Sequence, residues 1–212
     1  MIKVENKFAR HGVFWFWSLP IVAVLIMPIL FSPNSFRISA EEMSVFSDTM
    51  GIDTNATTIK ANLIFSSLFV DSGFYATVNK FFRSTYTGAF QIASQAQAQH
   101  VNSTYASALW LMLYRGIWRL TALWPAVFSI VLALGIPSLI DGWITRARKS
   151  YTFESHNPVY FWSASHSFIM VLGLGFLLPL TPVALSPMTF FVYSVILCLT
   201  AWVTAANFQT GT

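Results

Sequence analysis

Charge is scarce in this sequence. Of its 212 residues, 9% are Asp, Glu, Lys or Arg, and 55% are apolar. Soluble domains usually carry about a quarter charged residues, because a water-facing surface needs polar cover. A water-solvated globule of this composition would expose large apolar patches. The composition therefore predicts an integral membrane protein.

Cysteine is nearly absent, and residues for catalysis do not cluster. Cys198 is the single cysteine, whereas an intramolecular disulfide or a thiolate metal site needs several sulfurs. The histidines lie far apart and share no spacing typical of metal ligands; they are His11, His100, His156 and His166. Phosphate-binding glycine loops, metalloprotease motifs and nucleophile elbows are missing as well. We therefore expect no enzymatic activity, no metal site and no cofactor.

Four uncharged apolar stretches are long enough to cross a bilayer as helices, which takes about 20 residues. They are Val13 to Phe31, Leu120 to Ile140, Phe161 to Leu180 and Thr189 to Ala206. The first follows a basic head and could be a signal peptide, but its apolar core is long and contains two prolines. We interpret it as an anchor. The sequence thus predicts an all-α, polytopic membrane protein with four transmembrane helices and an extracytoplasmic helical insertion between the first two.

The positions of basic residues predict the orientation, because Lys and Arg near membrane spans are retained in the cytoplasm. Basic residues occur in the head and between the second and third spans, as Lys3, Lys7, Arg10, Arg146, Arg148 and Lys149. The predicted organisation is a cytoplasmic head with the first span (1–31), an extracytoplasmic helical segment (32–119), a three-helix membrane region (120–206) with a basic cytoplasmic loop (141–160), and a tail (207–212). Both termini are then cytoplasmic.

The segment 32–119 carries helix signals of its own. Ser39 and Glu42 form a capping box, and Gly51 is a suitable helix end. A second helix is expected over residues 57–82, amphipathic and packed on the membrane or on a partner, with Asp71 on its polar side. The alternative is a fifth crossing through 62–78, which would place the Asp71 carboxylate in mid-membrane at high cost. Residues 93–99 favour a helix that runs into the second span.

One ionisable side chain, His166, lies inside a predicted span, flanked by Ser163 and Ser167. Intramembrane polar groups usually face protein or a water-filled cavity. We interpret His166 as a neutral imidazole that is hydrogen-bonded between helices. The alternative is a proton relay or ligand pocket, which would need a second titratable group. Gly173 and Gly175 of the same span are interpreted as helix-packing positions.

Two arginines, Arg115 and Arg119, lie one helical turn apart near the start of the second span, among several tryptophans. We expect them to reach lipid headgroups while the indoles lie in the interface. Pairing with an acidic partner is the alternative.

The stretch that begins at Asp141 holds the compact basic patch Arg146, Arg148 and Lys149. Contact with anionic lipids is the first interpretation, and a cytoplasmic protein is the second. Three charges are too few for one subunit to bind DNA, although a homo-oligomer would multiply them.

The chain also contains an ordered series of short motifs: Phe69-Val70-Asp71-Ser72-Gly73, Tyr114-Arg115, Trp124-Pro125, Asp141-Gly142 with Arg146 and Arg148, Phe153, Asn157-Pro158-Val159-Tyr160 with Ala164, the prolines 179, 182 and 187, and Ala206-Asn207-Phe208-Gln209. Together they resemble the inner-membrane proteins of integrating conjugative elements and conjugative plasmids, from about Leu63 to the C-terminus. Two positions depart from that pattern, because members usually have Ser-Pro at Asn157-Pro158 and often His at Phe161.

This resemblance implies a non-enzymatic role in conjugative DNA transfer, in a bacterial inner membrane that holds a type IV secretion apparatus. It implies the coupling ATPase and other secretion components as partners, with no sequence-specific binding of nucleic acid. A scaffold or docking protein is the leading hypothesis. The alternatives are a small transporter or channel built around His166, and an entry-exclusion factor that acts through residues 32–119.

Overall fold

The computed structural model describes residues 8–84, 94–151 and 158–208, and every regular element within these ranges is a helix. The chain divides into two compact units. The first, here called the bundle unit, consists of residues 1–21, 124–178 and 188–212. The second, the hairpin unit, consists of residues 22–123 and 179–187.

Four helices in the described ranges are long and apolar enough to cross a membrane: Phe8–Leu30, Thr104–Lys149, Val159–Leu180 and Pro187–Ala206. Each overlaps one predicted span, so the all-α class and the four candidate crossings are confirmed. The first comprises α1 (Phe8–Val13), the π-helix η1 (Phe14–Ser18) and α2 (Leu19–Leu30). The third comprises α7 (Pro158–Leu177) and the short η4 (Leu178–Leu180), and the fourth is α8 (Pro187–Ala206).

The second candidate span is part of a single long helix, α6 (Ser94–Tyr151), of 58 residues. The predicted helix near residues 93–99 therefore does run into the span, although Ala93 itself lies outside the described residues. The structure differs from the predicted loop at 141–160, because residues 141–151 are helical and continue α6. Gly142 lies within this helix and packs tightly against α8. Residues 152–157 lie outside the described ranges.

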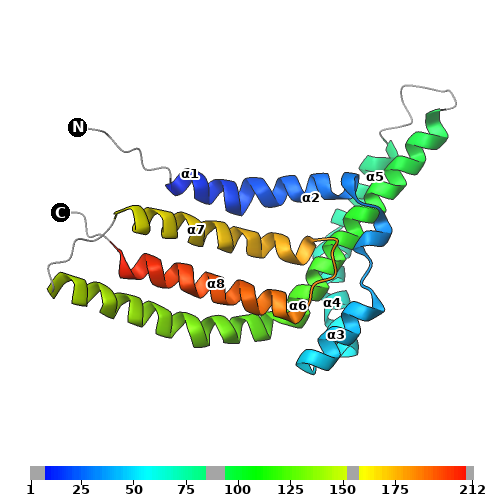
Figure 1. Ribbon diagram of the computed structural model, residues 1–212. Coiled ribbons are helices and arrows are strands. Elements are labelled where there is room, and N and C mark those ends of the chain that lie inside the picture. The colour runs from blue at the N-terminus through cyan, green and yellow to red at the C-terminus, as the bar shows by residue number, and fades with distance from the viewer. Residues whose placement is uncertain (1–7, 85–93, 152–157, 209–212) are drawn as a thin grey trace, which may run out of the picture. The chain divides into compact units, whose positions relative to one another are not determined.

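Contacts within the bundle unit fix the directions of its helices (Figure 1). His11 of α1 lies beside His166 of α7, and Phe16 of η1 lies beside Phe176 of α7, so the first helical segment runs parallel to α7. Phe161, near the start of α7, contacts Phe208, which follows the end of α8. Gly175, near the end of α7, lies against Tyr193 in the first half of α8. These two helices are antiparallel.

The C-terminal part of α6 runs parallel to α8, because Gly135 faces Cys198 and Gly142 faces Trp202 and Ala205. The start of α1, the end of α6, the start of α7 and the end of α8 therefore share one end of the bundle unit. A chain that crosses a bilayer four times has this arrangement.

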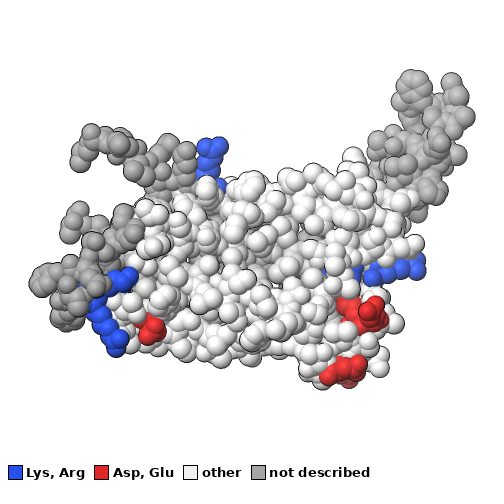
Figure 2. Space-filling view, in the orientation of Figure 1, with Lys and Arg blue, Asp and Glu red and all other residues white. Residues whose placement is uncertain are grey.

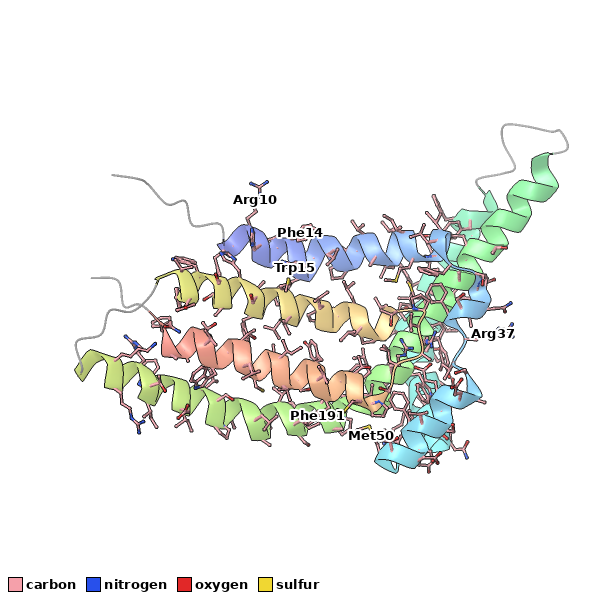
Figure 3. The ribbon with its side chains drawn as sticks, viewed as in Figure 1. Arg10, Phe14, Trp15, Arg37, Met50 and Phe191 are labelled. Atoms are coloured by element: carbon pink, nitrogen blue, oxygen red, sulfur yellow. The ribbon has the colours of Figure 1, made fainter. Side chains whose placement is uncertain are left out.

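Glycines allow the closest approaches in the bundle unit. A Cβ at Gly173 would lie 2.7 Å from Trp15 Cβ and 2.8 Å from its carbonyl oxygen. In Figure 3, Trp15 points from η1 toward α7, whereas Arg10 points away from the helices. A Cβ at Gly142 would lie 2.9 Å from both Ala205 Cβ and the Trp202 carbonyl oxygen. The predicted packing role of Gly173 is thus confirmed.

The hairpin unit begins with the end of α2, the short 3-10 helix η2 (Pro33–Phe36) and α3 (Ala40–Met50). The Ser39 hydroxyl accepts a hydrogen bond from the Glu42 N–H at 3.0 Å, and Gly51 ends the helix in a left-handed conformation with φ 63°. The predicted cap and helix end are both confirmed, since each follows from local chemistry.

The expected single helix over residues 57–82 is wrong. The structure has α4 (Thr54–Phe65), the π-helix η3 (Ser66–Val70) and α5 (Phe74–Ser84), separated by a break at 71–73. Gly73 adopts φ 75°, a conformation that suits glycine, and the Ser72 hydroxyl accepts a hydrogen bond from the Phe74 N–H at 3.3 Å. The break also means that no straight helix runs through 62–78, the alternative fifth crossing.

The helices α4 and α5 run antiparallel to the N-terminal half of α6. Thr58 accepts a hydrogen bond from Trp118 Nε1, and Asn79 accepts one from Trp110 Nε1, both at 3.1 Å. The earlier residue, Thr58, thus meets the later position on α6, and the later residue, Asn79, meets the earlier one, as expected for antiparallel segments. The core of this unit contains Phe36, Ala108, Leu109 and Met112, with Val24, Met27, Val78 and Phe82 packed against it.

Candidate functional site

A buried ion cluster joins α3 to α6 in the hairpin unit. The Glu42 carboxylate accepts hydrogen bonds from Arg115 Nη2 at 2.5 Å and from Arg119 Nε at 2.7 Å. All three residues are buried, and Arg119 is 0% exposed. Helical spacing places both guanidinium groups on one side of α6, where a single carboxylate meets them.

Other donors of the two arginines bind backbone carbonyl oxygens, whereas Arg115 Nε is buried and has no hydrogen-bond partner among the described residues. Arg115 Nη1 donates to Ser35 at 2.7 Å and to Pro182 at 2.9 Å. Arg119 donates to the carbonyl groups of the same connector between α7 and α8, at Pro179 (3.1 Å), Thr181 (2.8 Å) and Val183 (2.5 Å). The cluster thereby fixes α3, α6 and residues 179–183 to one another.

This arrangement differs from the expected headgroup contact of Arg115 and Arg119, because their side chains are buried inside the hairpin unit. The acidic group that pairs with them is Glu42 of the same chain. Sequence reasoning assigned Glu42 to a helix cap and gave its side chain no further role. The scarcity of charge in the sequence was a signal for this contact, because the few charged residues of such a chain need partners when they are buried, and Glu42 is one of eight acidic residues.

A second cluster lies in the bundle unit, where the end of α6 meets the end of α8; we call it the basic end. Asp141 Oδ2 accepts a hydrogen bond from Trp202 Nε1 at 2.7 Å. Lys149 Nζ donates to Asn207 Oδ1 at 3.0 Å. The structure thus joins the motif at Asp141-Gly142 to the motif at Asn207-Phe208, about 60 residues apart in sequence.

Aromatic rings frame the cations of the basic end. The Arg146 guanidinium lies over the Trp143 ring, 4.9 Å from its centroid, and 5.4 Å from that of Phe208. Trp143 itself is 59% exposed, and Arg148 is exposed. Figure 2 shows basic atoms over this end of α6 with an acidic group beside them, whereas the visible surface over α7 and α8 is uncharged. The cluster presents cations and an indole together, which suits an acidic surface or phosphate groups.

The structure places a second histidine beside His166. The ring centroids of His11 and His166 lie 4.5 Å apart, and the Trp162 ring stacks on the His166 imidazole at 6.1 Å between centroids. His166 Nδ1 is buried, and no residue that the structure describes forms a hydrogen bond with it. Ser163 is exposed and Ser167 is half-buried. The sequence gave no sign of the His11 contact, because it joins positions 155 residues apart.

Asp71 lies at the break between η3 and α5. Its carboxylate is exposed and accepts a hydrogen bond from the Ser66 hydroxyl at 3.4 Å. The motif Phe69 to Gly73 thus forms a turn in the hairpin unit and is distant in sequence from the basic end.

Comparison with known proteins identifies one family. The family model described as IncC plasmid conjugative DNA transfer protein DtrJ-like matches residues 39–209. No curated protein and no solved structure matches the chain. The matched range begins before Leu63, where the resemblance seen in the sequence began, and it includes Glu42 with both arginines of the ion cluster. The chain therefore belongs to the DtrJ-like family of conjugative DNA transfer proteins.

Proposed function

We infer that this protein is a non-enzymatic scaffold of the conjugation machinery in the bacterial inner membrane, and that its basic end docks the coupling ATPase of a type IV secretion apparatus. Membership in the DtrJ-like family supports the part in DNA transfer. Four helices of membrane-crossing length support the membrane location. The docking role is our own step beyond these findings.

The observation that carries the docking role is the composition of the basic end. Arg146, Arg148 and Lys149 gather at the end of α6 with an exposed Trp143. Basic residues next to a membrane span favour the cytoplasmic side, where an ATPase that handles DNA would reside. Arginine and tryptophan are also the residues that contribute most to binding energy at protein interfaces.

The hairpin unit gives this scaffold a rigid part. Its arginines bind Glu42 and the carbonyl groups of the α7–α8 connector, so α6 is fixed at one end of its membrane span. Under the predicted orientation this unit is extracytoplasmic, and it would be available to other secretion components there.

Deletion of the gene from its conjugative element tests the part in transfer. We expect the mating frequency to fall by orders of magnitude and to return when the chain is supplied in trans. A normal frequency in the deletion would contradict the proposal.

Expression in recipient cells alone tests the exclusion alternative, which predicts reduced transfer into those cells.

Charge reversal tests the docking role. The variants Arg148→Glu and Arg146→Glu/Arg148→Glu should lose co-purification with the coupling ATPase, because an acidic partner surface would now be repelled. Arg37→Glu is the control, since Arg37 is an exposed arginine of the hairpin unit. Equal recovery of the ATPase with all three variants would contradict docking at the basic end.

The histidine pair supports a second candidate, a small transporter or channel. A relay through His166 needs a second titratable group, and His11 lies against it. Flux of protons or small ions in proteoliposomes that is lost in both His11→Ala and His166→Ala would favour this function. Flux that is absent from the unaltered protein would exclude it.

A further inference from the structure

Polar contacts tie the end of α8 to the end of α6. The Asn207 side chain is buried, and both of its polar atoms form hydrogen bonds. Its Nδ2 group donates to the Val203 carbonyl oxygen at 2.9 Å, and its Oδ1 accepts from Lys149 Nζ at 3.0 Å. Lys149 Nζ also donates to the Ala206 carbonyl oxygen at 3.5 Å. One buried amide thus joins the last turn of α8 to a cation of α6.

This contact holds the Lys149 ammonium group in place. The last carbonyl groups of a helix have no partner within the helix and form its negative end, so a cation is stabilised there. An unrestrained lysine side chain samples many rotamers, and its ordering on binding costs entropy. The amide of Asn207 therefore orders one cation of the basic end before a partner binds.

The next residue, Phe208, contacts a second cation of the basic end. Its ring centroid lies 5.4 Å from Arg146 Cζ, and that of Trp143 lies 4.9 Å from the same atom. Phe208 is itself held by the Phe161 ring of α7, with the centroids 5.6 Å apart. A planar guanidinium group stacks on aromatic faces. The two rings therefore restrict the position of the Arg146 guanidinium group.

The cations and the side chains that hold them come from different parts of the chain. Arg146 and Lys149 belong to α6, whereas Asn207 and Phe208 follow the end of α8. Side chains that are ordered before association bind a partner more tightly, because less freedom is lost on binding. The geometry of the basic end thus depends on two uncharged residues as well as on its cations.

We propose that Asn207 and Phe208 are positioning residues of the docking site, which hold Lys149 and Arg146 in the geometry that an acidic partner surface binds. This inference rests on the proposed docking of the coupling ATPase at the basic end. It adds the end of α8 to that site. Removal of either uncharged side chain should weaken docking although no charge is lost.

Affinity measurements with the full-length protein in nanodiscs and the purified coupling ATPase test this role. Phe208→Ala and Asn207→Ala should each weaken binding by about five-fold, as expected for the loss of one such contact. Phe208→Tyr keeps the ring and should restore binding. Phe191→Ala is the matched control, since Phe191 is an exposed phenylalanine of α8. Equal affinities for Phe208→Ala, Asn207→Ala and the control would overturn the proposal.

A second background tests whether Phe208 acts through Arg146. In an Arg146→Ala protein, the further change Phe208→Ala should have no added effect, because the cation that the ring positions is gone. Additive losses would overturn the positioning role of Phe208, since the ring would then contribute to binding by itself.

Lysine acetylation tests the role of Asn207 without the ATPase. Asn207→Ala should raise the rate at which acetic anhydride modifies Lys149 several-fold. Lys60, an exposed lysine of the hairpin unit, should react as it does in the unaltered protein. An unchanged rate at Lys149 would overturn the role of Asn207.

The variant Arg148→Glu separates this inference from the proposed function. If Arg148→Glu abolishes binding of the ATPase while Phe208→Ala and Asn207→Ala bind normally, the basic end docks the ATPase and the positioning role is wrong. If Arg148→Glu binds normally as well, docking at the basic end is wrong, and the positioning role fails with it.

Discussion

The hairpin unit and the bundle unit achieve tight packing with different chemistry. In the hairpin unit, charged and polar side chains are buried and paired: Glu42 binds two arginines, and the indole groups of Trp110 and Trp118 donate to side-chain oxygens. In the bundle unit, the close contacts are steric, where Gly142 and Gly173 allow neighbouring backbones to approach.

The difference shows how each unit specifies its own geometry. A hydrogen-bonded cluster has directional requirements, so it selects one arrangement of α3, α6 and the connector 179–183. Helices in lipid gain little from apolar burial alone, and small residues let them pack closely enough to associate. A polar substitution should therefore damage the hairpin unit most, and a change of size should damage the bundle unit most.

The largest effect is expected from Glu42→Gln. The change leaves two buried guanidinium groups without a counter-charge, and loss of one partner of a buried pair costs about 3 to 5 kcal/mol. Glu41→Gln is the control, since Glu41 is the exposed neighbour. Thermal unfolding in detergent should show a large drop in melting temperature for the first variant alone. Equal melting temperatures for the two variants would mean that the cluster does not hold the unit.

Gly142→Ala should follow in size. The new methyl group would lie 2.9 Å from the Trp202 carbonyl oxygen and 3.3 Å from the Ala206 nitrogen, which are backbone atoms. Overpacking of this kind costs about 1 to 3 kcal/mol. Gly12→Ala is the matched control, because nothing lies within 4 Å of a Cβ at that site. An unchanged melting temperature for Gly142→Ala would show that α6 and α8 are not in close contact there.

Thr58→Val tests a single hydrogen bond of the hairpin unit without a change of shape. Trp118 is fully buried, and its Nε1 group donates to the Thr58 hydroxyl. An uncompensated buried donor costs about 1 to 3 kcal/mol. Thr77→Val, at an exposed position of α5, should have little effect on the melting temperature. If the two valine variants melt alike, the hydrogen bond contributes nothing measurable.

The smallest effect is expected from Asp141→Asn. The Trp202 indole can still donate to the amide oxygen, so the loss is restricted to the charge of the acceptor, about 0.5 to 1.5 kcal/mol at an exposed site. Hydrogen exchange at the end of α6 should rise modestly, with no change at residues 104–119. Faster exchange in the hairpin unit would contradict the separation of the two units.

The sequence predicts the features that depend on local chemistry. The cap at Ser39, the helix end at Gly51 and the four apolar spans follow from a few neighbouring residues or from hydropathy. The break at Gly73 was missed because the apolar periodicity continues across it. The Glu42 cluster and the His11 contact were missed because they join residues more than 70 positions apart, and a single sequence carries no record of such pairs.

The central claim, that the basic end docks the coupling ATPase, is tested most directly by photo-crosslinking in donor cells. Trp143 is replaced by p-benzoylphenylalanine, and Phe128, an exposed residue within the same membrane span, is replaced in the control. We expect light to link the ATPase to position 143 and not to position 128. An ATPase that is linked to neither position, or to position 128 alone, would contradict the claim.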